Sequence, residues 1–249
     1  MIIPLKKFGQ NFLQNKDILN KIVESAEIDE NDTVLEIGPG LGSLTKVLIS
    51  KAKEVIAIEK DNRLIDKLSK LDIKLINKDI LDYEIDLDSY KVVANLPYYI
   101  TLPIIRKFIE SNKPPKTMTL LIQKEVAEKI CSDKSSLPKI AIEFFAKAKI
   151  LFYVSKDEFK PKPKVDGAVI HIYDIQKNVP SIDQGLFFKI LKSGFQFRRK
   201  TIVNNLSKDF DKELVKNILN KTDVPLTARP ENIDLQHWIN IVEQFNFVV

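Results

Sequence analysis

Two hydrophobic patterns alternate over the first two thirds of the chain. Short continuous apolar runs are typical of strands buried on both faces, and apolar residues that recur every three or four positions indicate amphipathic helices. Strands are expected at 33–37, 54–58, 74–77, 91–94, 117–122, 150–154 and 165–173. Helices are expected at 17–26, 43–50, 63–71, 104–110, 124–130 and 140–146.

Strands that alternate with helices predict an α/β fold with a doubly wound, Rossmann-like parallel sheet. A short proline-rich segment, and no helix, joins the last two strands. We therefore expect these two strands to form an antiparallel hairpin at the end of the sheet.

The pattern changes after residue 173. Residues 177–181 are polar and contain a proline, as in a linker. Helical periodicity follows at 184–196, 199–206, 213–219 and 235–245. The sequence thus predicts an α/β domain over residues 1–176 and a small all-helical domain over 182–249.

Bulk composition excludes some classes of protein. With 44% hydrophobic residues, the 249-residue chain can bury a substantial core. No apolar run reaches the roughly 18 residues that a membrane-spanning helix needs, and the first residues lack the pattern of a signal peptide. The single cysteine, Cys131, excludes an internal disulfide bond. A cytoplasmic protein is expected.

The net charge of +5 and the pI near 9.0 suit a polyanionic partner. A composition rich in lysine, isoleucine and asparagine explains the same basicity without any partner. The placement of arginine is more informative, since two of the five arginines, Arg198 and Arg199, precede Lys200 directly. With Phe195 and Phe197 beside them, these residues can contact RNA phosphates and bases, although a solvated helix face has the same composition.

A glycine-rich loop at residues 36–42 (EIGPGLG) follows the first predicted strand of the sheet and opens a helix. Glycines such as Gly38 and Gly40 let the backbone turn tightly and approach a ligand closely. Glu59 ends the next strand, where a carboxylate can accept hydrogen bonds from ribose hydroxyls. A nicotinamide dinucleotide would use the same geometry.

Asp79 follows the third predicted strand, and Ile80 comes directly after it. The carboxylate can accept a hydrogen bond from a nucleoside amino group while Ile80 packs on the ring. A turn or helix cap is the alternative role for Asp79.

The most specific pattern is Asn95, Leu96, Pro97 and Tyr98, directly after the fourth predicted strand. The amino nitrogen of adenine is a poor nucleophile because its lone pair is delocalised into the ring. The Asn95 side-chain oxygen and the Leu96 main-chain oxygen can accept hydrogen bonds from its two N–H groups and direct the lone pair at a methyl donor. Pro97 restricts the backbone, and Tyr98 can stack on the base. The alternative is a turn with a packed tyrosine.

Between the last two strands lies the segment 159–165 (FKPKPKV). Its prolines favour an extended backbone, and Lys160, Lys162 and Lys164 suit phosphates. Phe159 can cover the second face of a base or, equally well, anchor a solvated loop to the core. His171 and His237 have no partners at metal-ligand spacing, so no metal site is expected.

In this order, the motifs resemble the rRNA adenine N6-dimethyltransferase family, and the bacterial small-subunit (16S) branch most of all. The resemblance covers essentially the whole chain. It rests on 7–13 (KFGQNFL), 38–42, Glu59, Asp79, 95–98, 123–128 (QKEVAE), 159–165 with Asp166, and 197–200 (FRRK).

The resemblance implies a class I methyltransferase that uses S-adenosyl-L-methionine, releases S-adenosyl-L-homocysteine, and acts as a monomer on rRNA in a small ribosomal subunit or its precursor. It further implies two adjacent target adenosines in a hairpin near the 3′ end of that rRNA. By matching position, the cofactor contacts would be Asn11, Leu13, Gly38, Gly40, Glu59, Asp79, Ile80 and Asn95. The target adenine would lie against 95–98, with Phe159 as a second stacking face.

Two positions depart from the family pattern. Residues 132–138 (SDKSSLP) replace a stretch that often contains Tyr-Gly, and Gly167 stands where serine is common. Neither departure touches a cofactor position. Two alternative functions stay open: a resistance-type adenine methylase of large-subunit rRNA, and a ribosome-assembly factor that acts mainly by binding.

Overall fold

The computed structural model describes residues 10–97, 100–197 and 199–246. The chain divides into two compact units, Met1–Glu128 with Ala146–Lys177, and Lys129–Phe145 with Asn178–Val249. The division after Lys177 lies in the linker expected between 1–176 and 182–249, whereas residues 129–145, expected in the first domain, belong to the helical unit. They pack there because the Phe144 ring lies 4.3 Å from that of Phe187 and the Ser135 N–H donates to the Glu231 carbonyl.

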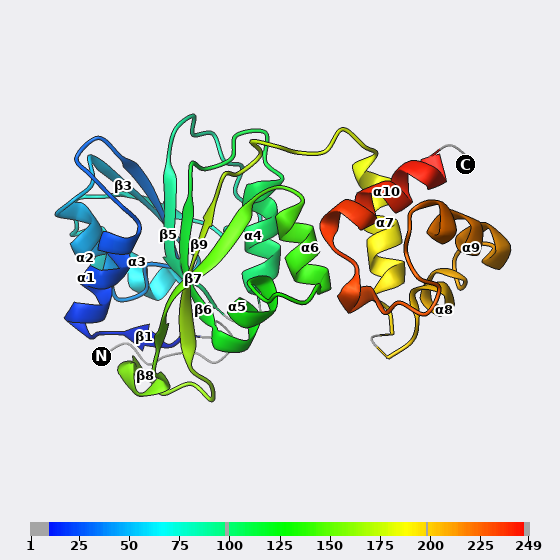
Figure 1. Cartoon of the computed structure of the whole chain (residues 1–249). Coiled ribbons are helices and arrows are strands. Elements are labelled where there is room, and N and C mark those ends of the chain that lie inside the picture. Colours follow the sequence, from blue (N-terminus) through cyan, green and yellow to red (C-terminus); the bar gives the residue numbers. More distant parts are fainter. Residues whose placement is uncertain (1–9, 98–99, 198, 247–249) are drawn as a thin grey trace. The chain divides into compact units, whose positions relative to one another are not determined.

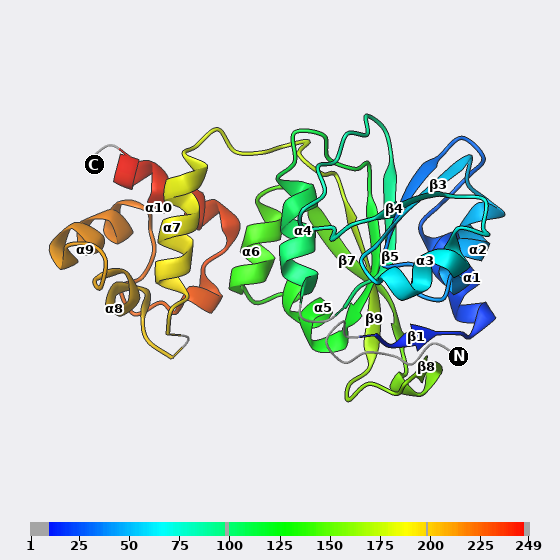
Figure 2. The ribbon, with the colours of Figure 1, turned by 180° about the vertical axis from the view of Figure 1, so that it is seen from behind.

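The first unit is built on a seven-stranded sheet of order β4-β3-β2-β5-β6-β9-β7 (Figures 1 and 2). Its strands are β2 (Thr33–Ile37), β3 (Glu54–Glu59), β4 (Lys74–Asn77), β5 (Lys91–Asn95), β6 (Met118–Gln123), β7 (Lys147–Val154) and β9 (Gly167–Tyr173). The first five are mutually parallel, and β9 pairs antiparallel with both β6 and β7. The expected α/β class and the terminal antiparallel hairpin are both confirmed.

The strand order reverses between β2 and β5. The chain moves outward from β2 to β4 and then returns to β5 on the other side of β2. Ligands of open α/β sheets bind beyond the carboxyl ends of the strands at such a reversal. The loops after β2 and β5 are therefore the first place to look for a site.

Three helices lie between consecutive parallel strands: α2 (Ser43–Ile49), α3 (Asn62–Leu68) and α4 (Thr101–Ile109). Helix α1 (Lys16–Ser25) precedes β2, and α5 (Lys124–Ile130) follows β6. Asn15 caps α1 by accepting from the Asp17 and Ile18 N–H groups. The apolar side of α1, with Leu19, Ile22 and Val23, joins a buried core with residues of α2 and the sheet.

A second, two-stranded antiparallel sheet pairs β1 (Phe12–Leu13) with β8 (Phe159–Lys160). A short 3-10 helix, η3 (Lys156–Glu158), precedes β8, and the Asn15 amide donates to the Glu158 carboxylate at 2.8 Å. The periodicity did not predict this sheet, because two residues per strand leave no pattern to detect. It brings Phe12 and Leu13 beside the beginning of the lysine-rich loop.

The second unit consists of helices. They are α6 (Leu137–Glu143), α7 (Gln184–Gly194), α8 (Ile202–Leu206), α9 (Lys212–Lys221) and α10 (Leu235–Asn246), with the 3-10 helix η4 (Pro230–Asn232) before α10. Its core centres on Trp238, which is fully buried and donates from its indole N–H to the Ile233 carbonyl. Gly194 lies so close to Trp238 that an added Cβ would be 2.3 Å from the ring.

Most element bounds agree with the expectation to within three residues. The hydroxyl of Ser136 caps α6, which therefore begins at residue 137 rather than 140, and the hydroxyl of Thr201 caps α8, which begins at 202 rather than 199. Within the described ranges, no helix combines the length and the apolar character needed to span a bilayer.

Candidate functional site

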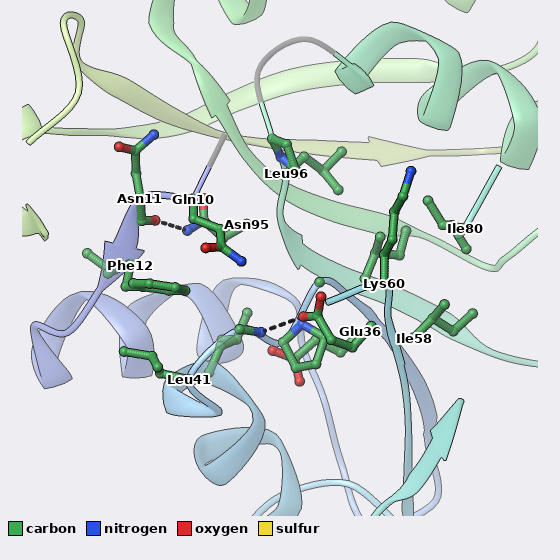
Figure 3. Close-up of a pocket in the computed structure, with 18 of the residues that line it drawn as sticks. Gln10, Asn11, Phe12, Glu36, Leu41, Ile58, Lys60, Ile80, Asn95 and Leu96 are labelled. Atoms are coloured by element: carbon green, nitrogen blue, oxygen red, sulfur yellow. Dashed lines mark hydrogen bonds between the residues drawn. The ribbon is translucent and has the colours of Figure 1, made fainter. Parts of the chain in front are cut away.

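A pocket opens at the carboxyl ends of the parallel strands, at the reversal between β2 and β5 (Figure 3). Its empty space, open mouth included, is about 1030 Å³. All eight positions matched to cofactor contacts line it: Asn11, Leu13, Gly38, Gly40, Glu59, Asp79, Ile80 and Asn95. Leu96 and Pro97 line it as well. Segments far apart in the sequence therefore meet at a single pocket.

The glycine loop forms the floor between β2 and α2. Gly38, Gly40 and Gly42 have φ angles of 65°, 58° and 79°, a region that side chains with a Cβ rarely adopt. A Cβ on Gly40 would lie 2.9 Å from the Phe12 ring. Two constraints thus require glycine at position 40: the left-handed backbone and the aromatic ring beside it.

Glu59 ends β3 and is only 6% exposed. Its carboxylate accepts from the Gly40 N–H at 3.1 Å and from the Asp61 N–H at 2.7 Å. Burial raises the pKa of Glu59 against these two hydrogen bonds. Because each carboxylate oxygen has two lone pairs, one main-chain donor per oxygen leaves room to accept a ligand hydroxyl.

Glu36, on β2, also lines the pocket and is 1% exposed. Its Oε2 atom has no hydrogen-bond partner among the described residues. Burial raises the pKa of Glu36 to about 8, and the charge of Glu59 acts in the same direction, against a smaller opposing effect of Thr45. The sequence analysis gave Glu36 no role beyond its place in the glycine loop. Because buried polar atoms are normally paired, this oxygen is a candidate contact for a ligand in the pocket.

Asp79 lies in the loop after β4, where it forms an ion pair with Lys60 at 2.5 Å. Its other oxygen accepts from the Leu81 N–H at 3.0 Å, as in an Asx turn. Burial alone would raise the pKa of Asp79, but the hydrogen bonds from Lys60 and Leu81 outweigh it and lower the pKa. Ile80 is 5% exposed and lines the pocket beside this carboxylate.

Asn95 ends β5, and its side-chain amide is oriented by a contact with the N-terminal segment. Its Nδ2 donates to the main-chain oxygen of Asn11 at 3.2 Å (Figure 3). This hydrogen bond orients the amide plane. The Oδ1 atom can then accept a hydrogen bond from a ligand. The next residue is anchored too, since the Leu96 N–H donates to the Leu121 carbonyl at 3.0 Å.

Pro97 supports the loop that follows. Its carbonyl accepts from the Ile100 N–H at 3.2 Å and from the Thr101 hydroxyl at 3.3 Å. Tyr98, expected to stack on the base, lies outside the described residues.

Phe159 does not line this pocket. It is 2% exposed and belongs to the core beneath the small sheet, together with Leu13, Leu121 and Val169. A base cannot stack on a ring that is covered on both faces. In this structure Phe159 anchors the lysine-rich loop, which was the alternative interpretation of the sequence.

The basic residues proposed to contact RNA are exposed to solvent where the structure describes them. Lys160, Lys162 and Lys164 are exposed in the loop that follows Phe159. Lys162 forms an ion pair with Asp157. Arg199 and Lys200 are exposed in the helical unit, and Arg198 lies outside the described residues.

The pocket lining also includes residues that were not individually expected, among them Gln10, Phe12 and Lys60. Gln10 donates to the Asp61 carboxylate at 2.8 Å and so ties the N-terminal segment to the end of β3. Such contacts depend on tertiary folding and leave no local signal. Within the described residues, no group of three histidine, cysteine or acidic side chains is placed to hold a metal ion.

Comparison with known proteins identifies relatives of the whole chain. Residues 5–246 match the family model described as ribosomal RNA adenine dimethylase. A protein of Fusobacterium nucleatum subsp. nucleatum, ribosomal RNA small subunit methyltransferase A, is 41% identical, and the match covers 96% of this chain and 97% of that protein. The protein of the same name from Streptococcus gordonii is 40% identical over 92% of this chain and 88% of its own length.

Solved structures agree with the fold. A dimethyladenosine transferase from Plasmodium falciparum matches with a TM-score of 0.82 and 26% identity, over 95% of this chain and 98% of that chain. The 23S rRNA methyltransferase ErmE matches with a TM-score of 0.73 and 26% identity, over 95% of this chain and all of that chain.

Proposed function

Because the chain belongs to the ribosomal RNA adenine dimethylase family, we propose that it transfers methyl groups from S-adenosyl-L-methionine to the N6 amino group of adenosines in small-subunit rRNA. The main support for the proposal is that Asn95 lines the same pocket as the other positions matched to cofactor contacts. By family analogy, two adjacent adenosines in a hairpin near the 3′ end are the targets.

The pocket fits the cofactor in its chemistry. Glu59 has the acceptor capacity for ribose hydroxyls, and Asp79 with Ile80 suits the amino group and ring of the cofactor's adenine. The Oε2 atom of Glu36 can accept from the ammonium group of the cofactor's methionine portion, and that positive charge would favour the ionised form of a carboxyl that burial otherwise keeps protonated. When bound, the cofactor supplies an electrophilic methyl group on a sulfonium.

The protein's part in the reaction is to activate and aim the amine. Asn95 Oδ1 and the Leu96 main-chain oxygen accept hydrogen bonds from the two N6–H groups, so that electron density stays on nitrogen. Each methyl transfer forms the N–C bond as the S–C bond breaks, and one N6 proton leaves to solvent. Because Asn11 holds the Asn95 amide in place, this acceptor is oriented before the base arrives. Tyr98 would hold the base by stacking.

We assign the α/β unit to cofactor binding and chemistry and the helical unit to RNA binding. The exposed lysines 160, 162 and 164 in the first unit and Arg199 with Lys200 in the second unit provide phosphate contacts. The protein would act as a monomer, one chain on each small subunit or precursor.

Methylation of large-subunit rRNA is the second candidate. It is favoured by the similarity to ErmE, whose identity to this chain equals that of the dimethyladenosine transferase structure. The curated relatives at 40–41% identity carry the small-subunit name, which is why we place that target first.

The decisive experiment maps methylation. Undermethylated small and large ribosomal subunits are incubated separately with the protein and methyl-labelled S-adenosyl-L-methionine, and the modified nucleosides are located by digestion and mass spectrometry. Labelled N6-methyladenosines in the small subunit only are expected. Label in the large subunit only would move the assignment to the second candidate. Tight small-subunit binding without any label would indicate an assembly factor that acts by binding.

A further inference from the structure

Phe197 is an aromatic side chain that the helical unit leaves in solvent. The residue is 38% exposed, and every other phenylalanine of the described residues is buried or half-buried. Phe195, two residues earlier, is half-buried and stacks on Trp238 with ring centroids 5.5 Å apart. The sequence presents these two rings as equivalent, but only one has a core role.

The backbone of Phe197 is held firmly although its ring is exposed. The fully buried side chain of Asn205, on α8, accepts from the Phe197 N–H and donates to the Phe197 carbonyl, both at 3.1 Å. The same carbonyl accepts from the Lys200 N–H at 3.0 Å. Burying an amide to fix the position of an exposed residue is costly unless its hydrogen bonds are satisfied, and here they are.

Two cations lie over the Phe197 ring. The ammonium groups of Lys208 and Lys200 are 3.5 and 4.7 Å from the ring centroid. Such contacts at exposed sites are weaker than the stacking of a nucleobase on an aromatic ring. A base can therefore displace an ammonium group from the ring face, and the displaced lysine remains within reach of the backbone phosphates.

We propose that Phe197 is a stacking platform for an unpaired RNA base, with Lys200 and Lys208 holding the phosphates beside that base. The proposal rests on the proposed function, since it assumes that the partner is RNA. It adds a second base-binding site, on the helical unit and separate from the residues around Asn95. A paired base shows no free face, so the platform selects single-stranded or looped RNA over duplex.

The test compares four proteins: the parent, Phe197→Leu, Phe197→Trp and Phe210→Leu. Phe210 is the matched control because it is a half-buried phenylalanine of the same unit with a lysine nearby, Lys189, but its ring packs on Phe245 at 4.7 Å. Each protein is titrated with a single-stranded oligoribonucleotide carrying 2-aminopurine and with a duplex of equal length. Stacking quenches the 2-aminopurine fluorescence.

Phe197→Leu should weaken single-strand binding by about 5- to 100-fold. It should also abolish the quenching, change duplex binding by less than about threefold, and leave the salt dependence unaltered. Phe197→Trp should restore both affinity and quenching. Phe210→Leu should resemble the parent, and urea unfolding checks that each variant is folded. Equal losses on single strand and duplex, or full binding by Phe197→Leu, would overturn the proposal.

A Lys208→Gln variant separates charge from stacking. It should lower the log-log salt slope for single-stranded RNA by about 0.7 while the quenching persists. Loss of quenching in Lys208→Gln would contradict stacking on Phe197. These readouts do not involve methyl transfer, so the platform can fail while methylation is observed, and methylation can fail while the platform binds.

Discussion

Asn95 is held by Asn11 in the orientation that the amine chemistry needs. Its acceptor should matter more as positive charge develops on the adenine nitrogen, so its stabilisation grows toward the transition state. We expect Asn95→Ala to lower the single-turnover methylation rate at saturating cofactor by about 100- to 1,000-fold, as for the loss of one preorganised donor from an oxyanion hole.

The matched control for Asn95 is Asn77→Ala. Asn77 also ends a parallel strand, and its amide donates to the Glu59 carbonyl at 2.8 Å. Its loss should reduce stability and leave the single-turnover rate within a few-fold of the parent. A near-normal rate for Asn95→Ala would remove the amine-activation mechanism.

Glu36 should make stability depend on pH. The pKa of Glu36 is raised from 4.5 to about 8 in the folded protein, so between these values the folded chain keeps a proton that the unfolded chain has released. The free energy of unfolding therefore falls as pH rises through this window, by at most about 1.4 kcal/mol per pH unit. Glu36→Gln cannot ionise, and its advantage over the parent should grow from pH 5 to pH 8 and then level off.

Urea unfolding at pH 5, 6, 7, 8 and 9 measures this difference. Glu54→Gln is the control, because Glu54 is exposed at the opposite end of β3 from Glu59. Its difference from the parent gives the baseline for replacing an exposed glutamate on the same strand. A flat difference for Glu36→Gln would show that Glu36 ionises normally in the folded protein.

At the scale of one element, the two glycines of α7 differ in how closely other side chains pack on them. Gly194 faces Trp238, and an alanine Cβ there would lie 2.3 Å from the indole ring. Since the buried indole is tied to Ile233, it cannot move aside freely. We expect Gly194→Ala to lower the free energy of unfolding by roughly 1–3 kcal/mol, as overpacking does.

Gly185→Ala tests the same substitution on the same helix. Its Cβ would meet only the Asp183 carboxylate, at 3.2 Å. The better helix propensity of alanine offsets this crowding, so the change should stay within about 1 kcal/mol. Chemical denaturation of both variants distinguishes close packing at Gly194 from a general effect of losing glycine in α7.

At the scale of the whole molecule, a net charge of +5 attracts any polyanion. A test of RNA binding must therefore distinguish the effect of where the basic residues lie from the effect of total charge. The double variant Arg199→Gln, Lys200→Gln should lower the log-log salt slope of RNA binding by up to about 1.4–1.8, that is, about 0.7–0.9 for each lost phosphate contact. Affinity for unrelated RNA should fall in parallel, because phosphate contacts carry no sequence information.

Lys67→Gln with Lys70→Gln removes the same charge elsewhere. Lys67 is in the last turn of α3 and Lys70 follows the helix; both side chains are exposed, and neither lines the pocket. This pair should leave the salt slope almost unchanged. Equal slopes for the two double variants would mean that total charge, and not the position of Arg199 and Lys200, governs RNA binding.

Local patterns in the sequence were enough to predict the succession of strands and helices along the chain. They also located the strand ends next to which Gly38, Glu59, Asp79 and Asn95 lie. The reason is physical: burial on both faces imposes continuous apolar runs, and parallel strands bring their carboxyl ends to one edge. Residues that follow those strands must then lie near one another, as the pocket lining confirms.

Tertiary structure alone decided what depends on contacts between distant segments. The pairing of β1 with β8 buries Phe159, burial beside Glu59 changes the pKa of Glu36, and residues 129–145 join the helical unit. Phe195 and Phe197 are alike in sequence, yet one packs on Trp238 and the other is exposed. Solvent exposure and desolvation are properties of the packed chain, and no periodicity of a single segment specifies them.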